Sequence, residues 1–104
     1  MNTLEKLNAT IAARKGASAD RSYTAKLLSQ GPEKCAKKFG EEAFELAMAA
    51  ALNNKANTAN EAADVLYHLL VLLQSTDVPL ADVMAILEKR EGTSGLVEKA
   101  NRDG

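Results

Sequence analysis

The amino-acid sequence predicts an all-α protein, because three observations agree. Residues that favour helix, namely Ala, Leu, Glu and Lys, are abundant, whereas the 104 residues contain only six Gly and two Pro. Apolar residues recur at helical spacing in several segments, and no segment alternates apolar and polar residues as a half-buried strand does. At this length we expect one domain over residues 1–104, built from four to five helices.

The composition argues against several classes of function. A net charge of -1 gives no basic field for nucleic acid, and 4% aromatic residues leave few platforms for stacking on bases. The apolar run from Val65 to Leu73 is too short for a membrane span, which needs ~20 residues. The first six residues lack the apolar stretch of a signal peptide. The one cysteine, Cys35, excludes an intrachain disulfide, and we expect it to be buried rather than reactive. A cytoplasmic protein is the simplest expectation.

Two helices are expected before residue 31. Thr3 is suited to cap a first helix that ends near Gly16, with a narrow apolar face formed by Leu4, Leu7 and Ile11. A small, polar connector follows. Ser22 is suited to cap a short second helix over Tyr23–Ser29, which Gly31 stops.

The third helix is expected to run from Pro32 to about Leu52, since Pro is at home in a first helical turn. At about 100° per residue, one apolar stripe contains Cys35, Phe39, Ala43, Leu46, Ala47 and Ala50. One flank of this stripe carries charged residues of both signs: Lys34, Lys38, Glu41, Glu42 and Glu45.

The fourth helix is expected after a polar break at Asn53–Asn57, with Asn57 or Thr58 as its cap and its end near Gln74. Its predicted core stripe consists of Ala62, Val65, Leu66, Leu69, Leu72 and Leu73, and Glu61, Asp64 and His68 line the adjacent flank. Leu70 and Val71 add apolar surface outside the stripe. A helix that is apolar over most of its circumference must be buried on several sides, which in so short a chain favours a partner subunit.

A fifth helix is expected to begin at Leu80 after Asp77-Val78-Pro79 and to end near Glu91-Gly92, with Val83, Met84 and Leu87 facing inward. The tail from Thr93 to Arg102 has little apolar content, so it either adds a helical turn or two or is loosely ordered.

The acidic residues of the third and fourth helices form two clusters that an antiparallel hairpin would bring level. Glu45 lies eight residues before Asn53 and Asp64 six residues after Thr58, which places them roughly 12 and 9 Å from the turn. Carboxylates held this close either raise one another's pKa or bind a hard divalent cation. Oxygen ligands favour Mg²⁺, or Mn²⁺, over zinc.

Two alternatives to this divalent site stay open. Glutamate pairs on helices are often solvated surface with lysine partners. A di-iron bundle would need Glu-x-x-His pairs, whereas the second cluster reads Glu61-x-x-Asp64, with His68 one turn further on. We expect His68 to line a groove or to form a hydrogen bond rather than to bind metal.

Lysines next to the acids extend the interpretation to a polyphosphate site. Lys34, Lys37 and Lys38 precede the acids by one to two turns, and ammonium groups beside a metal neutralise phosphate oxygens. Tyr23 and Lys26 are further candidates for substrate contacts. Ordinary ion pairs on a solvated helix are the alternative.

Several segments together resemble phosphoribosyl-ATP pyrophosphohydrolase, of the all-α MazG-like nucleoside-triphosphate pyrophosphohydrolase superfamily. The resemblance covers roughly residues 20–90 and rests on residues 22–28, on Gly31-Pro32 and Lys34, and on residues 37–45 and 60–73. The acid pattern is common to the superfamily, whereas Ser22-Tyr23-Thr24 and the run from Leu66 to Leu73 are more specific to the histidine-pathway enzyme.

The resemblance implies Mg²⁺-dependent hydrolysis of 1-(5-phosphoribosyl)-ATP to 1-(5-phosphoribosyl)-AMP and pyrophosphate, the second step of L-histidine biosynthesis. It implies a homodimer whose helices build a four-helix core. By position it implies metal binding by Glu42, Glu45, Glu61 and Asp64, and phosphate binding by Lys38 and Lys34. Glu41, the candidate catalytic acid, matches an extra acid that either binds the metal or positions the water. A housecleaning pyrophosphohydrolase of non-standard nucleoside triphosphates and a non-enzymatic helical dimerisation module stay open as alternatives.

Overall fold

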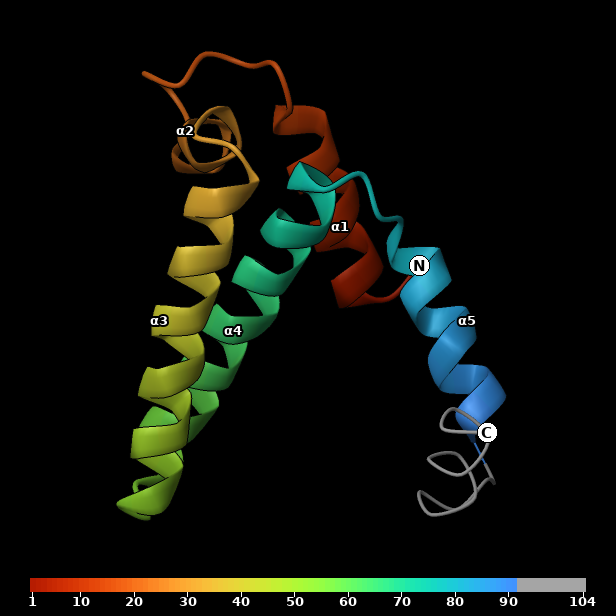
Figure 1. The fold of residues 1–104 in the computed structure, drawn as a ribbon. Coiled ribbons are helices and arrows are strands. Elements are labelled where there is room, and N and C mark those ends of the chain that lie inside the picture. Colours follow the sequence, from red (N-terminus) through yellow and green to blue (C-terminus); the bar gives the residue numbers. More distant parts are fainter. Residues whose placement is uncertain (92–104) are drawn as a thin grey trace.

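The computed structural model describes residues 1–91, which form five α-helices and no strand, so the predicted all-α class is confirmed. The helices are α1 (Thr3–Arg14), α2 (Tyr23–Ser29), α3 (Pro32–Ala51), α4 (Lys55–Ser75) and α5 (Leu80–Arg90). Helices α3 and α4 form a long antiparallel hairpin, α1 and α2 pack at its open end, and α5 turns away from it (Figure 1). The prediction for the tail after residue 92 lies outside the described residues.

Side-chain caps define where the first two helices begin. The Asn2 side chain accepts a hydrogen bond from the Glu5 amide at 2.8 Å, so Asn2 and not the predicted Thr3 caps α1. Asn and Thr are both suitable caps, and a shift of one residue is within the usual ambiguity of helix ends. Ser22 caps α2 as predicted, since its hydroxyl accepts from the Ala25 amide at 3.1 Å.

The hairpin turn between α3 and α4 is shorter than the predicted break at residues 53–57. Asn53 has a positive φ of 58° and closes α3, with the Asn54 amide donating to the Ala49 carbonyl at 3.1 Å. This is the Schellman arrangement, which Asn tolerates although Gly is more common there. The Asn54 side chain also accepts from the Asn57 amide at 3.1 Å and so caps α4. The fourth helix therefore begins at Lys55, and the prediction of Asn57 or Thr58 as its cap is wrong.

The hydrophobic core lies at the open end of the hairpin, where every helix contributes a side chain. Its most buried members are Ile11, Leu27, Cys35, Leu70, Val71 and Leu80. Cys35 is 2% exposed, and its thiol contacts the Leu27 carbonyl at 3.2 Å, which confirms the expected buried cysteine. Leu70 and Val71, predicted to lie outside the stripe of their helix, are among its most buried residues.

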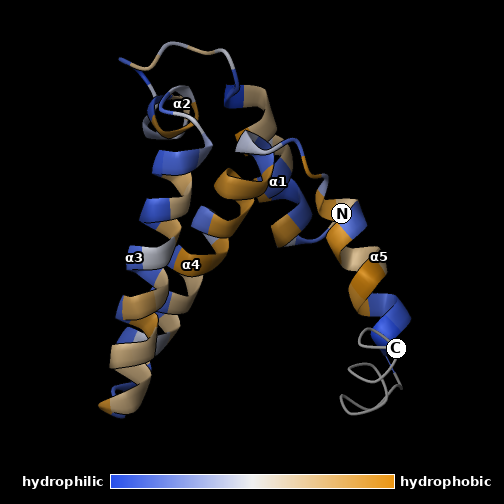
Figure 2. Cartoon of the chain, viewed as in Figure 1, coloured by the Kyte–Doolittle hydropathy of each residue, from blue (hydrophilic) through white to orange (hydrophobic). Residues whose placement is uncertain are grey.

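Several residues predicted to face the core are exposed in the single chain. Leu66 on α4 is 47% exposed, and Met84 and Leu87 on α5 are 44% and 53% exposed. On α3, Ala47 and Ala50 are exposed, whereas Glu42 is buried against α4. Hydrophobic residues recur along the upper half of α4 and along α5 (Figure 2). The apolar surface of these helices exceeds what one chain covers, so a stripe chosen by hydrophobicity alone does not identify the intrachain face.

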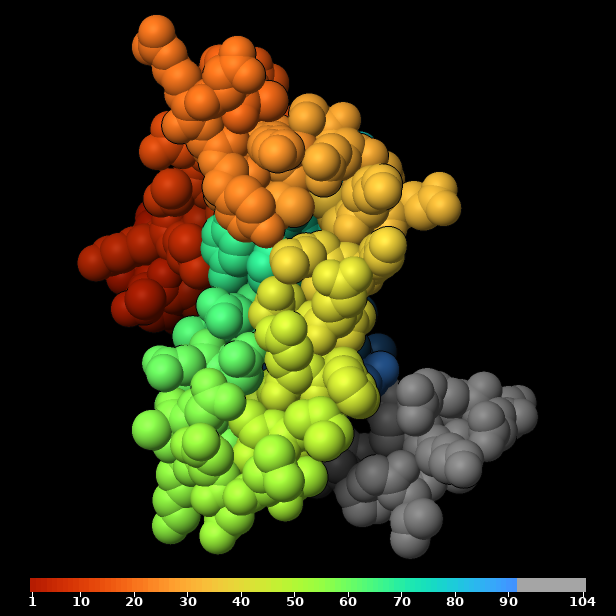
Figure 3. Space-filling model, turned by 90° about the vertical axis from the view of Figure 1, so that its left-hand side faces the viewer, coloured from red at the N-terminus to blue at the C-terminus, as the bar shows by residue number. Residues whose placement is uncertain are grey.

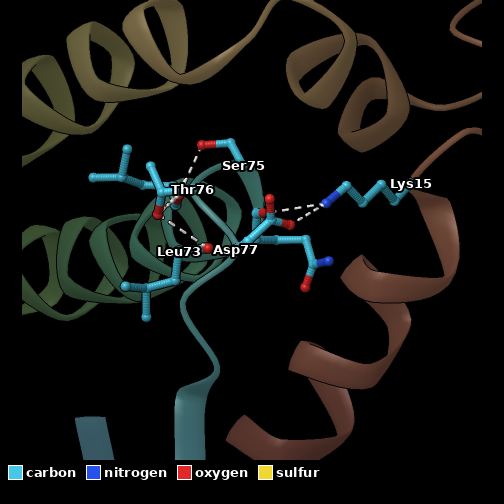
Figure 4. Close-up of polar contacts among 7 residues, drawn as sticks. Lys15, Leu73, Ser75, Thr76 and Asp77 are labelled. Carbon is cyan, nitrogen blue, oxygen red and sulfur yellow. Dashed lines mark hydrogen bonds and ion pairs between the residues drawn. The ribbon is translucent and has the colours of Figure 1, made fainter. Parts of the chain in front are cut away.

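The end of α4 is tied to the end of α1. Lys15 forms an ion pair of 2.6 Å with Asp77 and donates to the Gln74 carbonyl at 3.4 Å, while the Thr76 hydroxyl donates to the Leu73 carbonyl at 3.1 Å (Figure 4). Asp77 has a positive φ of 57°, and the chain bends by 115° between α4 and α5. Within residues 1–91 no single helix is long and apolar enough to span a bilayer, although the bent pair α4–α5 meets the criterion when its two helices are counted together.

Candidate functional site

Three glutamates from the two hairpin helices form a cluster of carboxylates. Glu42 and Glu45 come from α3 and Glu61 from α4, and each offers an oxygen that lies within 4.8 Å of those of the other two. Glu45 lies six residues before the end of α3 and Glu61 six residues after the start of α4, so both are about 9 Å from the turn. The tight turn thus brings these two acids level, and Glu42 joins them from one turn further along α3.

The sequence predicts Asp64 among these acids, but Asp64 is not part of the carboxylate cluster. It is exposed, one turn beyond Glu61 on α4. The predicted level of Asp64 depended on a helix starting near Thr58. Because α4 begins at Lys55, Glu61 takes the level that was predicted for Asp64. The structure therefore brings together three of the four acids.

The cluster is electrostatically strained. The negative charge of Glu42 is the main cause of a raised pKa at Glu45, with smaller contributions from desolvation and from Glu61. Glu42 is 8% exposed. Among the described residues, Glu61 Oε2 is the one buried side-chain oxygen or nitrogen without a hydrogen-bond partner. A buried carboxylate oxygen without a partner is costly, so a cation or a proton at this point would stabilise the cluster.

A pocket of about 280 Å³ lies between α2 and the first half of α3, and we call it the lysine pocket. Its lining contains all four candidates for substrate contacts and the candidate catalytic acid, namely Tyr23, Lys26, Lys34, Lys38 and Glu41. Leu27, Gln30 and Lys37 complete the lining. Figure 3 shows this side of the molecule, with α2 in orange above the yellow α3 and with α4 in green beside it. Gln30 is the C-cap residue that follows α2, and nothing in its sequence context marks it as a site residue.

Lys38 connects the lysine pocket with the carboxylate cluster. Its ammonium nitrogen lies 3.4 Å from Glu42 Oε1 and 3.8 Å from Glu41 Oε2. The contact with Glu42 is the main cause of a raised pKa for Lys38. Glu41 is half exposed and belongs to the pocket rather than to the cluster. An anion in the pocket therefore meets a lysine that is firmly protonated.

His68 lies buried in α4 between two tyrosine rings and is not part of the carboxylate cluster. Burial lowers its pKa, so the neutral imidazole is favoured at physiological pH. His68 is thus a buried residue with ring contacts to Tyr23 and Tyr67, and the expected hydrogen bond or groove position is not what defines its surroundings.

Comparisons with known proteins all point to the same protein family over nearly the whole chain. The sequence model of the family described as Phosphoribosyl-ATP pyrophosphohydrolase matches residues 4–91. A protein of Cereibacter sphaeroides named Phosphoribosyl-ATP pyrophosphatase is 64% identical over 102 residues, which are 98% of this chain and 99% of the relative. Proteins with this name from Dinoroseobacter shibae and Ruegeria sp. are 62% and 57% identical over 98% of this chain, and cover 100% and 97% of their own lengths. The chain therefore belongs to the phosphoribosyl-ATP pyrophosphohydrolase family.

Proposed function

We propose that this protein hydrolyses 1-(5-phosphoribosyl)-ATP to 1-(5-phosphoribosyl)-AMP and pyrophosphate with Mg²⁺, as the second step of L-histidine biosynthesis. The substrate class follows the printed names of the relatives. The observation that carries the proposal is the contact of 3.4 Å between Lys38 and Glu42, which joins a basic pocket to a cluster of carboxylates. A metal-bound polyphosphate needs these two environments side by side.

Glu42, Glu45 and Glu61 would hold the metal ion, and the orphaned Oε2 of Glu61 supports this choice. Carboxylate oxygens suit Mg²⁺, with Mn²⁺ as the alternative. Asp64 is a candidate fourth ligand, although it lies outside the group of oxygens within 4.8 Å. When bound there, a divalent cation would withdraw charge from the phosphate oxygens. It would thereby stabilise the pyrophosphate as it leaves.

The residues of the lysine pocket would bind the phosphates and direct the water. Lys26, Lys34 and Lys38 offer ammonium groups to phosphate oxygens, and the contact with Glu42 places Lys38 next to the carboxylate cluster. Glu41 lies in the same pocket and is suited to accept the proton of the attacking water. The thiol of Cys35 is buried against Leu27, so we favour direct attack by water over a covalent intermediate at cysteine.

We also propose that the protein is a cytoplasmic homodimer. Large apolar side chains on the outer face of α3 are exposed, with Phe44, Met48 and Leu52 at 64%, 44% and 74%. Leu66 on α4 and the apolar face of α5 are also uncovered. A second copy that covers these faces would complete the four-helix core that the resemblance implies. The single, free cysteine suits a reducing compartment.

The test is a comparison of substrates with the purified chain and Mg²⁺. We expect pyrophosphate release from phosphoribosyl-ATP at a kcat/KM at least about 100-fold higher than from ATP or dNTPs, which corresponds to about 2.7 kcal/mol of discrimination. Equal or faster release from dNTPs would favour the housecleaning reaction. If pyrophosphate were released from none of these triphosphates, the non-enzymatic dimerisation module would be the remaining alternative.

A further inference from the structure

Two segments that meet in the structure contain residues to which the reaction above gives no role. They are the start of α2 with Tyr23 and Thr24, and the middle of α4 with Tyr67 and His68. A hydrogen bond of 2.5 Å joins the Thr24 hydroxyl to the Tyr67 hydroxyl across 43 residues of sequence. It connects the helix that lines the lysine pocket to the helix that carries Glu61.

Ring packing reinforces this connection from the neighbouring residues. The His68 ring lies edge-to-face against Tyr67, with centroids 4.9 Å apart, and against Tyr23, with centroids 6.5 Å apart. His68 is buried, whereas Tyr23 is 55% exposed and lines the lysine pocket. Tyr23 is therefore held on its inner side and open to the pocket on its outer side. We call Tyr23, Thr24, Tyr67 and His68 the tyrosine clasp.

The orientation of α2 depends on such contacts because the helix is short. With seven residues it is far below the length at which an isolated helix is stable in water. Its cap at Ser22 and its buried residues Ala25 and Leu27 fix where it lies. A hydrogen bond from its first turn to α4 opposes rotation about its own axis, and rotation would move Tyr23 and Lys26 relative to the lysines of α3.

We propose that Thr24 and Tyr67 are positioning residues for the substrate: through the clasp they hold Tyr23 and Lys26 at the edge of the lysine pocket. Neither Thr24 nor Tyr67 lines that pocket, so they act through their neighbours. The inference depends on the proposed role of the lysine pocket in binding phosphates. Because Tyr23 and Lys26 would contact the substrate in both its ground and transition states, loss of the clasp should raise KM more than it lowers kcat.

The experiment measures steady-state kinetics with phosphoribosyl-ATP for Tyr67→Phe, Thr24→Val and the double variant in the full chain. Each single variant should raise KM about 3–10-fold with kcat within about twofold, the range expected for loss of one hydrogen bond. The double variant should be no worse than either single variant, because both remove the same bond. Thr24→Ser retains the hydroxyl and should restore KM to within about twofold of wild type.

A matched control separates positioning from a general loss of stability. Thr76→Val also removes a hydroxyl, one that donates to the Leu72 carbonyl at 3.0 Å at the end of α4, away from the lysine pocket. It should lower Tm without changing KM. Unchanged KM in Tyr67→Phe and Thr24→Val, effects that multiply in the double variant, or a loss confined to kcat would overturn the proposal. If Tyr67→Phe does not fold, Thr24→Val and Thr24→Ser decide the question.

Lys38→Gln distinguishes failure of the clasp from failure of the proposed site. If Lys38→Gln raises KM while the clasp variants do not, the lysine pocket binds the phosphates as proposed. In that case the positioning role of Thr24 and Tyr67 is wrong. If Lys38→Gln leaves kcat/KM unchanged, the proposed binding of phosphates in the pocket is itself wrong.

Discussion

Glu45 is the residue at which the electrostatic cost of the carboxylate cluster is most visible. Its pKa is raised, mainly by the charge of Glu42, so the folded state disfavours the ionised form. A carboxyl whose pKa is higher in the folded state than in the unfolded state stabilises the fold below its unfolded-state pKa. This stabilisation is lost as the pH rises through the folded-state pKa. In the metal-free protein, ionised Glu45 should therefore destabilise the fold at neutral pH.

Replacing Glu45 by Gln should raise the Tm of the metal-free protein at pH 7 to 8, and the difference should vanish below about pH 3, where the carboxyl is protonated in both states. The same variant should lose most of the Tm gain that Mg²⁺ gives to the wild type. Thermal unfolding with and without EDTA measures both effects. Glu88→Gln, an exposed acid on α5, serves as control. A lower Tm for Glu45→Gln without metal would contradict this account.

Lys38 is the residue that joins the two halves of the site. Lys38→Gln should reduce kcat/KM about 10–100-fold, the cost of losing a hydrogen bond to a charged group, whereas Lys6→Gln on the exposed side of α1 should have no effect. Steady-state release of pyrophosphate measures this loss. An unchanged kcat/KM would show that the ion pair with Glu42 is only structural.

Charge and helical phase predict the three glutamates of the cluster, and the structure brings Glu42, Glu45 and Glu61 together. The predicted substrate contacts of α2 and α3 also meet, in the lysine pocket. Gln30 is missing from the predicted site, because an uncharged side chain at a helix end carries no pattern. Asp64 is predicted beside the other acids, because a helix that starts three residues later shifts every level by about 4.5 Å.

At the scale of elements, the turn between α3 and α4 determines which acids meet. Asn54→Ala removes the cap of α4 and should cost about 1 kcal/mol, or roughly 4–8 °C in Tm. Asn57→Ala should change stability by less than about 0.5 kcal/mol, because its backbone amide and not its side chain takes part in the cap. Chemical denaturation of both variants measures the difference. Equal losses would contradict the assigned cap.

The helices themselves were predictable because their caps, proline and apolar spacing agree, as at Ser22 and Pro32. The turn was not, because Asn53 adopts a positive φ that sequence rules reserve mainly for Gly. With no Gly at this point, the polar run from Asn53 to Asn57 resembled a longer loop.

Across the whole molecule, large apolar side chains are exposed on α3, α4 and α5. No contact within the described chain covers these faces. Leu66, which the sequence places in the core stripe of α4, is 47% exposed, whereas Leu70 and Val71, which it places outside the stripe, are buried. Helical periodicity identifies apolar positions but not what covers them, so the sequence does not distinguish a face packed within the chain from an uncovered one.

Phe44→Glu should convert the proposed dimer into a monomer, because it places a charge in the centre of an apolar face. Light scattering should give twice 11.1 kDa for the wild type and 11.1 kDa for the variant. Ala13→Glu, on the exposed part of α1, should remain dimeric. A wild-type mass of 11.1 kDa would contradict the dimer.

We propose that the carboxylate cluster and the lysine pocket act as one metal-dependent site, and a titration with Mg²⁺ examines both together. Pyrophosphate release from phosphoribosyl-ATP is titrated with Mg²⁺ for the wild type and for Glu61→Gln, which removes the charge from the carboxylate with the orphaned oxygen. We expect the wild type to be inactive in EDTA and saturable by Mg²⁺, and the variant to lose at least about 100-fold in kcat/KM with its helix content retained. Equal activity in EDTA, or an unaltered Mg²⁺ dependence in Glu61→Gln, would contradict the account.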